Sequence, residues 1–370
     1  MFRDMENNQQ PPVIAAQTPT NDTSPTIPAP KPAPRRRTGW IVYAVIATVI
    51  LFLSVLGNFV LLAFVGGNGS SVSLDTVHHR DFEEHYMQGD TDARNKVVVV
   101  HLSGIISGSY DGEVSDEGMV GDIKAQLKQA AEDKQVKAVI LRVNSPGGEV
   151  VASDAIYNAL VELRDKQCKP IVTCMESVGA SGAYYAAMGT SHVMATDLTI
   201  TGSIGVIMQS FNFGGLMDKV GVRSHTFKSG KYKDLLNPTR EPTDDEKQMV
   251  DVLIKEVYDK FAGIVARERH LNLDKLKTTL ADGRILSGNQ ALKGKLIDGV
   301  GHFDDAVTKA MQLGNVKTAK VVTYRAPFSF RHLFRLFGET KTSKIQVQVG
   351  PALPKLETGK LYFLPAYMFQ

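Results

Sequence analysis

The chain has 370 residues, a formal net charge of +3 at pH 7 and 43% hydrophobic side chains. This length leaves room for one or two domains with a sizeable core, and the weak positive charge gives no indication of a nucleic acid partner. The only two cysteines, Cys168 and Cys174, are too few for a disulfide framework, and we expect Cys174 to be a buried free thiol.

The N-terminal part of the chain has the pattern of a membrane anchor. Residues 1–37 hold eight of the sixteen prolines, a composition typical of a disordered tail. Residues 38–66 are uncharged and apolar enough to form a single transmembrane helix. Arg35, Arg36 and Arg37 precede this helix, so the positive-inside rule places the tail in the cytoplasm and the rest of the chain on the outer side of the membrane. The alternative is a cleaved signal peptide, whose apolar region is usually shorter, at about 7–15 residues.

Beyond a linker at residues 67–93, in which residues 75–92 are expected as a short helix or loop, the chain alternates between two kinds of pattern. Short apolar runs predict strands at 97–102, 136–143, 170–174, 193–195 and 204–208. Helical spacing predicts helices at 119–132, at 150–166 and from Ser181 onward. Strands that alternate with helices indicate an α/β fold of repeated βαβ units around a mostly parallel sheet.

A long helix and an irregular extension follow. Thr243-Asp-Asp-Glu246 has the form of a capping box that opens a helix ending near His270. Its apolar stripe is either core or a subunit contact, and it consists of Val250, Leu253, Ile254, Val257, Phe261, Ile264 and Val265. Residues 326–370 contain four prolines and are expected to form an irregular C-terminal extension.

Two glycine-rich loops are candidates for a catalytic site. Ser181 lies among small residues after the predicted strand at 170–174, and residues 144–148 follow the strand at 136–143. Both loops lie at the carboxyl edge of the parallel sheet, where ligands bind in such folds. Ser181 is therefore a candidate nucleophile, and the backbone N–H groups of Gly148 and Gly182 are candidate oxyanion donors. Alternatively, Ser181 only caps a closely packed helix.

A serine nucleophile needs a base, and a lysine cluster is the best candidate. Lys228, Lys231 and Lys233 lie within six positions, so like-charge repulsion and burial would favour the neutral form of one of them. A solvated basic loop is the alternative. His192 and His225 are available for a triad, but no well-placed acidic residue marks either as an oriented base.

Five motifs, taken in order, resemble those of the signal peptide peptidase A family, peptidase family S49 of the ClpP/crotonase fold. They cover residues 145–148, 179–185, 201–205, 229–234 and 281–298. The resemblance extends over residues 94–325 and implies Ser181 as nucleophile and Lys233, directly before Asp234, as general base. It also implies Gly148 as an oxyanion donor and Ser203 as the hydroxyl that orients the lysine, with no metal or cofactor.

The function expected from this resemblance is a membrane-anchored serine endopeptidase that cleaves remnant signal peptides and other apolar peptides. In short-form relatives the dyad forms between neighbouring subunits of a ring-like octamer, with the C-terminal tail near the substrate groove, so a homo-oligomer is expected here. One alternative is a stomatin-associated membrane peptidase of the same fold, which would carry further membrane spans and a C-terminal β-barrel. Another is a catalytically inactive scaffold, against which the intact dyad argues.

Overall fold

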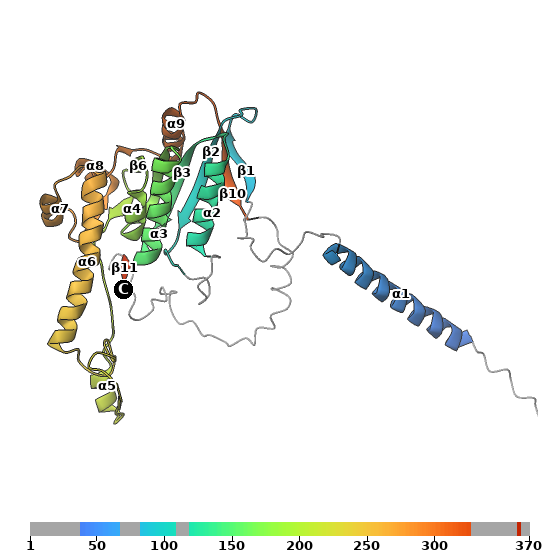
Figure 1. The fold of residues 1–370 in the computed structure, drawn as a ribbon, viewed down its shortest axis with the longest axis horizontal. Coiled ribbons are helices and arrows are strands. Elements are labelled where there is room, and N and C mark those ends of the chain that lie inside the picture. The colour runs from blue at the N-terminus through green and yellow to red at the C-terminus, as the bar shows by residue number, and fades with distance from the viewer. Residues whose placement is uncertain (1–37, 67–81, 109–117, 327–360, 364–370) are drawn as a thin grey trace, which may run out of the picture. The chain divides into compact units, whose positions relative to one another are not determined.

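The computed structural model describes residues 38–66, 82–108, 118–326 and 361–363, and it divides into two units, residues 1–76 and 77–370. The first unit contains helix α1, Thr38–Gly66 (Figure 1). Within it, the 20 residues Gly39–Asn58 have a mean hydropathy of 2.4, which makes this helix long and apolar enough to cross a membrane.

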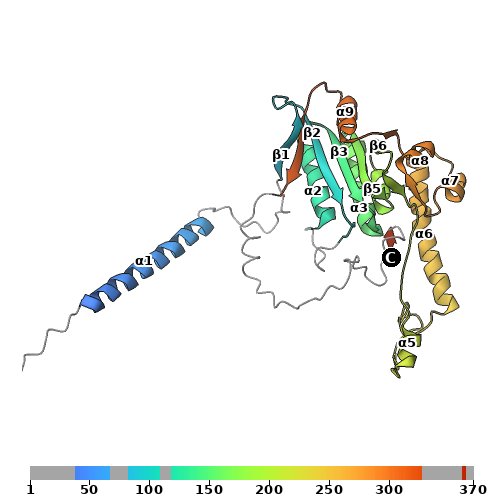
Figure 2. The ribbon, with the colours of Figure 1, turned by 180° about the vertical axis from the view of Figure 1, so that it is seen from behind.

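The second unit is built on a twisted sheet with mostly parallel strands (Figures 1 and 2). The strand order is β1-β10-β2-β3-β5-β6-β9, and β7 pairs with both β5 and β8. The strands of this sheet are β1 Glu83–Gly89, β2 Lys96–Ser103, β3 Val136–Ser145, β5 Ile171–Ala180, β6 His192–Ala195, β7 Ile200–Gly202, β8 Ile285–Ser287, β9 Gly299–Val300 and β10 Lys320–Arg325, whereas β4 Gly148–Glu149 and β11 Tyr362–Phe363 form a separate two-stranded sheet. In the larger sheet only the β1–β10 and β7–β8 pairs are antiparallel among the described strands.

Helices cover both faces of the sheet. The helices of this unit are α2 Met119–Glu132, α3 Val150–Val161 with a π-helical turn at Glu162–Lys166, α4 Gly182–Ala187, α5 Gly214–Lys219, α6 Asp244–Glu268, α7 Leu273–Thr279, α8 Gly288–Lys293 and α9 Phe303–Leu313, of which α5 lies away from the sheet (Figure 1). One core lies under α2, α3, α4 and α6, and a second core lies between the opposite face and α9. Side chains of β2 alternate between them, with Val98 and Val100 in the first core and Val97 and Val99 in the second.

The predicted βαβ pattern is confirmed, with four local differences. Residues 83–89 form an edge strand rather than a helix or loop, and the strand predicted at 170–174 continues to Ala180. Residues 204–208 form no strand, and Ile207 makes only an isolated bridge. The helix predicted at 150–166 ends as a π-helical turn. Cys174 is a buried free thiol, as expected, and burial raises its pKa to about 11.

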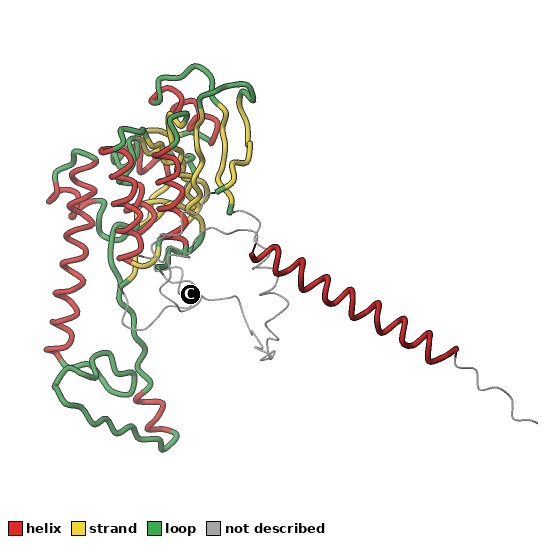
Figure 3. Tube along the Cα trace, turned by 45° about the vertical axis from the view of Figure 1, so that its right-hand side comes forward, coloured by secondary structure: helices red, strands yellow, loops and turns green. Residues whose placement is uncertain are grey.

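The two halves of α6 have different environments. The predicted capping box at Thr243 and Glu246 is present. The C-terminal half is packed into the core through Phe261, Ile264 and Val265. The N-terminal half continues a segment that projects away from the sheet and carries α5 (Figures 1 and 3). We call residues 208–250 the arm. Of the predicted apolar stripe, Leu253 is exposed, so the stripe is core only toward its C-terminal end.

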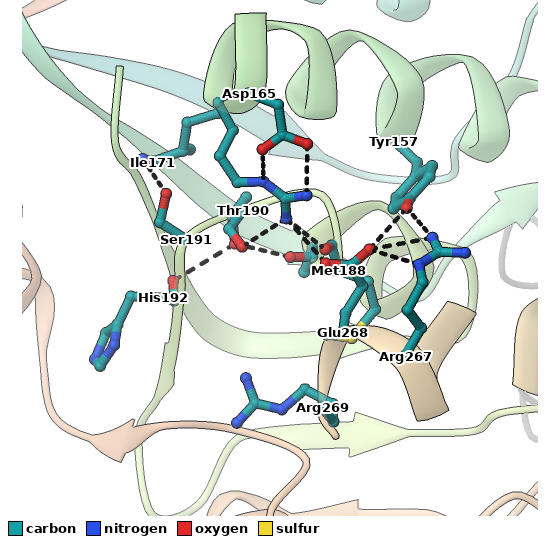
Figure 4. Close-up of polar contacts among 12 residues, drawn as sticks. Tyr157, Asp165, Ile171, Met188, Thr190, Ser191, His192, Arg267, Glu268 and Arg269 are labelled. Carbon is teal, nitrogen blue, oxygen red and sulfur yellow. Dashed lines mark hydrogen bonds and ion pairs between the residues drawn. The ribbon is translucent and has the colours of Figure 1, made fainter. Parts of the chain in front are cut away.

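A polar network holds the C-terminal end of α6 against α3 and its π-helical turn (Figure 4). Arg164 Nη1 donates to Glu268 Oε2 at 3.1 Å, and Arg267 Nη2 donates to the Tyr157 hydroxyl at 2.7 Å. The Tyr157 hydroxyl donates in turn to Glu268 Oε1 at 3.2 Å. These contacts fix one end of α6 to the body of the fold, although the other end belongs to the arm.

Candidate active site

Ser181 lies at a strained junction between β5 and α4. Its backbone has φ 54° and ψ −118°, a conformation that a residue with a side chain seldom adopts. The Ser181 N–H donates to the carbonyl of Gly202 at 2.8 Å, which anchors the turn to β7. Such a turn holds a side chain at the end of a strand, where it can be presented to a ligand.

The Ser181 hydroxyl is not engaged in structural hydrogen bonding within the described part of the chain. The residue is 1% exposed, and its buried Oγ has no hydrogen-bond partner among the described residues. Although Ser181 occupies the N-cap position of α4, its side chain makes no capping hydrogen bond. The alternative in which Ser181 merely caps the helix is therefore not supported. A buried hydroxyl without a partner is costly unless it has another role.

The candidate oxyanion donors lie next to each other, beside the nucleophile. A Cβ atom placed on Gly182 would lie 3.1 Å from the backbone nitrogen of Gly148, so the two amides are close in space. Gly147 has φ +104°, and a Cβ there would lie 2.6 Å from the Gly182 nitrogen. A side chain at either position would fill the small space that the amides surround, so only glycine leaves room for a substrate oxygen.

A described piece of the C-terminal segment occupies this space. Strand β11 pairs antiparallel with β4, with Phe363 opposite Gly148. On its other edge, Tyr362 exchanges two backbone hydrogen bonds with Ile207, at 3.1 and 3.2 Å. A Cβ placed on Gly147 would also lie 2.2 Å from the Phe363 carbonyl oxygen. An extended segment is thus held on both edges, with one carbonyl group at the candidate oxyanion donors, as a peptide bound by strand addition would be.

Ser203 directly follows the neighbouring strand β7, as Ser181 directly follows β5. The parallel register pairs Ala180 with Gly202, so the two serines follow equivalent positions. Ser203 also has a positive φ, of 51°, and its N–H donates to the carbonyl of Arg284 at 2.8 Å. A hollow of about 450 Å³ opens next to it, lined by Ser203, Val206, Ile207, Ile254, Tyr258 and Asp282 among others.

The lysines lie elsewhere in the same chain. The loop between α5 and α6 that carries them belongs to the arm, which Figures 1 and 2 show away from α4. Lys228 pairs with Asp234 at 2.5 Å, and Lys231 pairs with Asp245, which raises the pKa of Lys231. The repulsion expected among the three lysines is therefore offset by acidic neighbours. Lys233 is exposed and has no ion pair among the described contacts.

Neither histidine is placed to act on Ser181. His192 begins β6 opposite Val172, near the start of β5, whereas Ser181 follows the far end of that strand. On the neighbouring strand β3, Ile140 pairs with Val172 and Ser145 pairs with Gly179, so the two levels are roughly 20 Å apart along the sheet. His192 lies 3.8 Å from Asp298, and burial lowers its pKa. His225 is exposed in the arm. Among the described residues, the structure thus brings together Ser181, Gly148, Gly182 and Ser203, but it leaves Lys233 apart within one chain.

Local sequence patterns do not identify the aromatic residues that pack near the candidate site. Residues 361–363 were assigned to an irregular extension, although the aromatic pair Tyr362-Phe363 is a short strand signal. Tyr185 and Phe261, which pack around Phe363, were treated only as members of a motif and of an apolar stripe. Their proximity depends on tertiary contacts between α4, α6 and β11.

Comparisons with known proteins give one consistent result. The model of peptidase family S49 matches residues 163–317, and the Clp protease model matches residues 105–202. A putative signal peptide peptidase SppA of Enterococcus faecium is 35% identical over 235 residues, 63% of this chain and 68% of the relative. A putative protease of Synechocystis is 39% identical over 233 residues, 62% of this chain and 79% of the relative. The chloroplastic serine protease SPPA of Arabidopsis thaliana is 32% identical over 256 residues, 68% of this chain but 37% of the relative.

Proposed function

This chain belongs to peptidase family S49, and from that membership we propose that it is a serine endopeptidase with Ser181 as nucleophile and Lys233 as general base. The observation that carries the proposal is the buried Ser181 hydroxyl, which lacks a partner in the described chain and lies beside the amides of Gly148 and Gly182. A hydroxyl that makes no structural hydrogen bond and lies near two backbone amides fits acyl transfer better than a role in packing.

The proposed chemistry follows the geometry. The substrate lies in the position of β11, paired with β4 on one edge and with Ile207 on the other. Ser181 Oγ attacks its carbonyl carbon while the base removes the hydroxyl proton. The amides of Gly148 and Gly182 stabilise the negative charge on the oxygen, and each such donor contributes about 10²–10³ in rate. The protonated base then gives its proton to the leaving amine, and water releases the acyl group.

We infer that Lys233 acts from a second copy of the chain. Within one chain the arm holds Lys233 exposed and apart from Ser181, whereas a lysine base needs burial. The arm also exposes large apolar side chains, which favours contact with another subunit. These are Phe211, Phe213, Leu216, Val220, Val222 and Phe227. The hollow lined by Ser203 supports this inference, because it leaves space beside Ser203 for the side chain of Lys233 of the partner subunit. A ring such as an octamer would repeat this contact.

A serine-reactive phosphonate probe tests the proposed function. We expect the detergent-solubilised full-length protein to hydrolyse apolar peptides, and the probe to abolish that activity by forming one adduct. Mass spectrometry of the digest should place the adduct on Ser181, because its hydroxyl has no structural hydrogen bond among the described residues and the residue directly precedes one of the two proposed donors, Gly182. Absence of both labelling and hydrolysis would favour the inactive scaffold of the same fold.

We further propose that α1 anchors the peptidase in a cytoplasmic membrane, with the catalytic unit on the outer side, where it cleaves remnant signal peptides and other apolar peptides. The support is the uncharged helix α1 and the basic residues Arg35–Arg37 before it. Cysteine accessibility in intact cells should find a reporter at residue 20 protected and one at residue 300 labelled. Labelling at residue 20 alone would reverse the proposed orientation and exclude an outer-side substrate pool.

A further inference from the structure

The two proposed oxyanion donors belong to different segments of the chain. Gly148 lies in β4, which runs directly into α3, whereas Gly182 is the first residue of α4. The first turn of α4 also holds the nucleophile, because the Tyr185 N–H donates to the Ser181 carbonyl at 2.8 Å. The separation of the two donors, and their position relative to the nucleophile, therefore depend on how α3 and α4 pack together.

The two helices are in close contact at their N-terminal ends. The Ser153 hydroxyl on α3 donates to the Glu149 carbonyl at 2.8 Å, and a Cβ atom placed on Gly182 would lie 2.4 Å from the same hydroxyl oxygen. A side chain at position 182 would push the helices apart. This packing limits how closely the helices approach each other, but a directional contact is needed to fix their orientation.

Such a contact joins the two helices through the side chains of Asp154 and Tyr185. The Tyr185 hydroxyl on α4 donates to Asp154 Oδ1 on α3 at 2.5 Å, and Tyr185 is 1% exposed. Burial raises the pKa of Tyr185, and the hydrogen bond to Asp154 raises it further, so the hydroxyl keeps its proton and remains the donor. The Tyr185 ring also packs edge-on against Tyr157 of α3, with centroids 5.4 Å apart.

The Asp154 carboxylate is itself held by further donors. Lys260 of α6 pairs with Oδ1 at 2.8 Å, and Asn158 Nδ2 donates to Oδ2 at 3.2 Å. Burial raises the pKa of Asp154, but the hydrogen bonds from Lys260 and Tyr185 lower it below its usual value. The carboxyl group is therefore ionised at neutral pH, and a hydrogen bond to an ionised acceptor is stronger than one between neutral groups.

We propose that Asp154 is a positioning residue for the oxyanion donors. Through its hydrogen bond with the Tyr185 hydroxyl it fixes α4, and with it the amide of Gly182, relative to α3 and the amide of Gly148. The inference rests on the proposed function and adds a residue to that same site. Because the donors must lie about 2.7–3.1 Å from the oxygen that becomes charged, a small shift of α4 weakens transition-state stabilisation more than substrate binding.

The first measurement is a double-mutant cycle on the hydrolysis of an apolar fluorogenic peptide by the detergent-solubilised full-length protein. Tyr185→Phe and Asp154→Ala should each lower kcat about tenfold and leave KM within about twofold, since an interaction of the transition state is weakened. The double variant should also lose about tenfold, because both substitutions break the same hydrogen bond. Losses that multiply to about a hundredfold would overturn the proposal.

Two control variants test whether the effect is specific to the contact between α3 and α4. Tyr184→Phe removes a buried hydroxyl from the same helix, but this hydroxyl donates to the Leu296 carbonyl at 2.6 Å. Lys260→Met removes the ion pair from α6, and the Lys260 side chain is 57% exposed, so the pair contributes little. Both variants should keep kcat within about twofold. A tenfold loss in either would overturn the assignment of the effect to the hydrogen bond between Asp154 and Tyr185.

Amide hydrogen exchange separates this inference from the proposed function. It is followed by mass spectrometry of peptides that cover residues 146–150 and 181–186. In Tyr185→Phe, exchange should be at least about threefold faster in both segments, whereas Tyr184→Phe should affect only the second. This result supports the positioning role even if the wild-type protein cleaves no peptide.

Unchanged exchange at residues 146–150 in Tyr185→Phe overturns the inference, however efficiently the wild-type protein cleaves. Thermal melting shows whether each variant is folded. Should Asp154→Ala fail to fold, Tyr185→Phe, which removes a single oxygen atom, decides alone through kcat and hydrogen exchange.

Discussion

Replacing Ser181 by alanine is expected to lower peptide hydrolysis below about one hundredth of the wild-type rate, because the acyl-enzyme can no longer form. The variant should stay folded and assembled. The Ser181 hydroxyl has no hydrogen bond to lose among the described residues, and alanine removes only the oxygen. Initial rates on an apolar fluorogenic peptide, together with size-exclusion chromatography in detergent, measure both parts of the expectation.

Two further results bear on this assignment. Ser203→Ala should weaken activity less than Ser181→Ala, because Ser203 is proposed to orient the base and not to attack the substrate. A Ser181→Ala protein that retains more than about one hundredth of the activity would show that the nucleophile lies elsewhere. Thermal melting tests whether a loss of activity in either variant results from unfolding.

Replacing Lys233 by alanine is expected to have an equally large effect, and mixing the two inactive variants should restore activity. Each chain of Lys233→Ala still carries Ser181, and each chain of Ser181→Ala still carries Lys233. If the base comes from a neighbouring subunit, random co-assembly completes about a quarter of the sites, since each site needs one chain of each kind in the right order. Co-expression with two affinity tags, followed by tandem purification and assay, gives the measurement.

Two control variants are Lys231→Ala, from the same lysine cluster, and His225→Ala, which tests whether a histidine is the base instead. Lys231→Ala should keep most of the activity, because Lys231 is exposed and paired with Asp245. His225→Ala should do the same, whereas Lys233→Arg should be inactive because a guanidinium group stays protonated. Mixed oligomers that are proven to form and yet remain inactive would place the whole dyad within one chain.

Much of the fold follows from local sequence patterns. The helix predicted at 119–132 is α2 with the same bounds, and the Thr243–Glu246 capping box begins α6 as expected. The fold class, an α/β arrangement of the ClpP type, is confirmed by the sheet and by the Clp protease match. These features depend on the spacing of apolar residues and on contacts between neighbours in the chain, which the sequence records directly.

Predictions failed where the partner of a segment lies far away in the chain. Residues 83–89 are mostly polar because β1 is an edge strand. It is held by its pairing with β10, and this pairing leaves no apolar pattern in the sequence from which a strand could be predicted. Residues 204–208 are apolar enough for a strand, but their partner is the single residue Tyr362. The last residues of β5 pair with β7, which extends the strand beyond its apolar run to Ala180.

The sequence by itself determined the candidate nucleophile, the glycines around it and the apolar N-terminal helix, because each is a property of a few consecutive residues. Only the tertiary structure decided that the Ser181 hydroxyl is buried without a described partner, that Lys231 is paired with an acid, and that β11 pairs with β4. It also decided that the rings of Tyr185 and Phe261, from α4 and α6, pack against each other. Burial and the choice of partners depend on how distant segments pack together, and no local pattern along the chain encodes that arrangement.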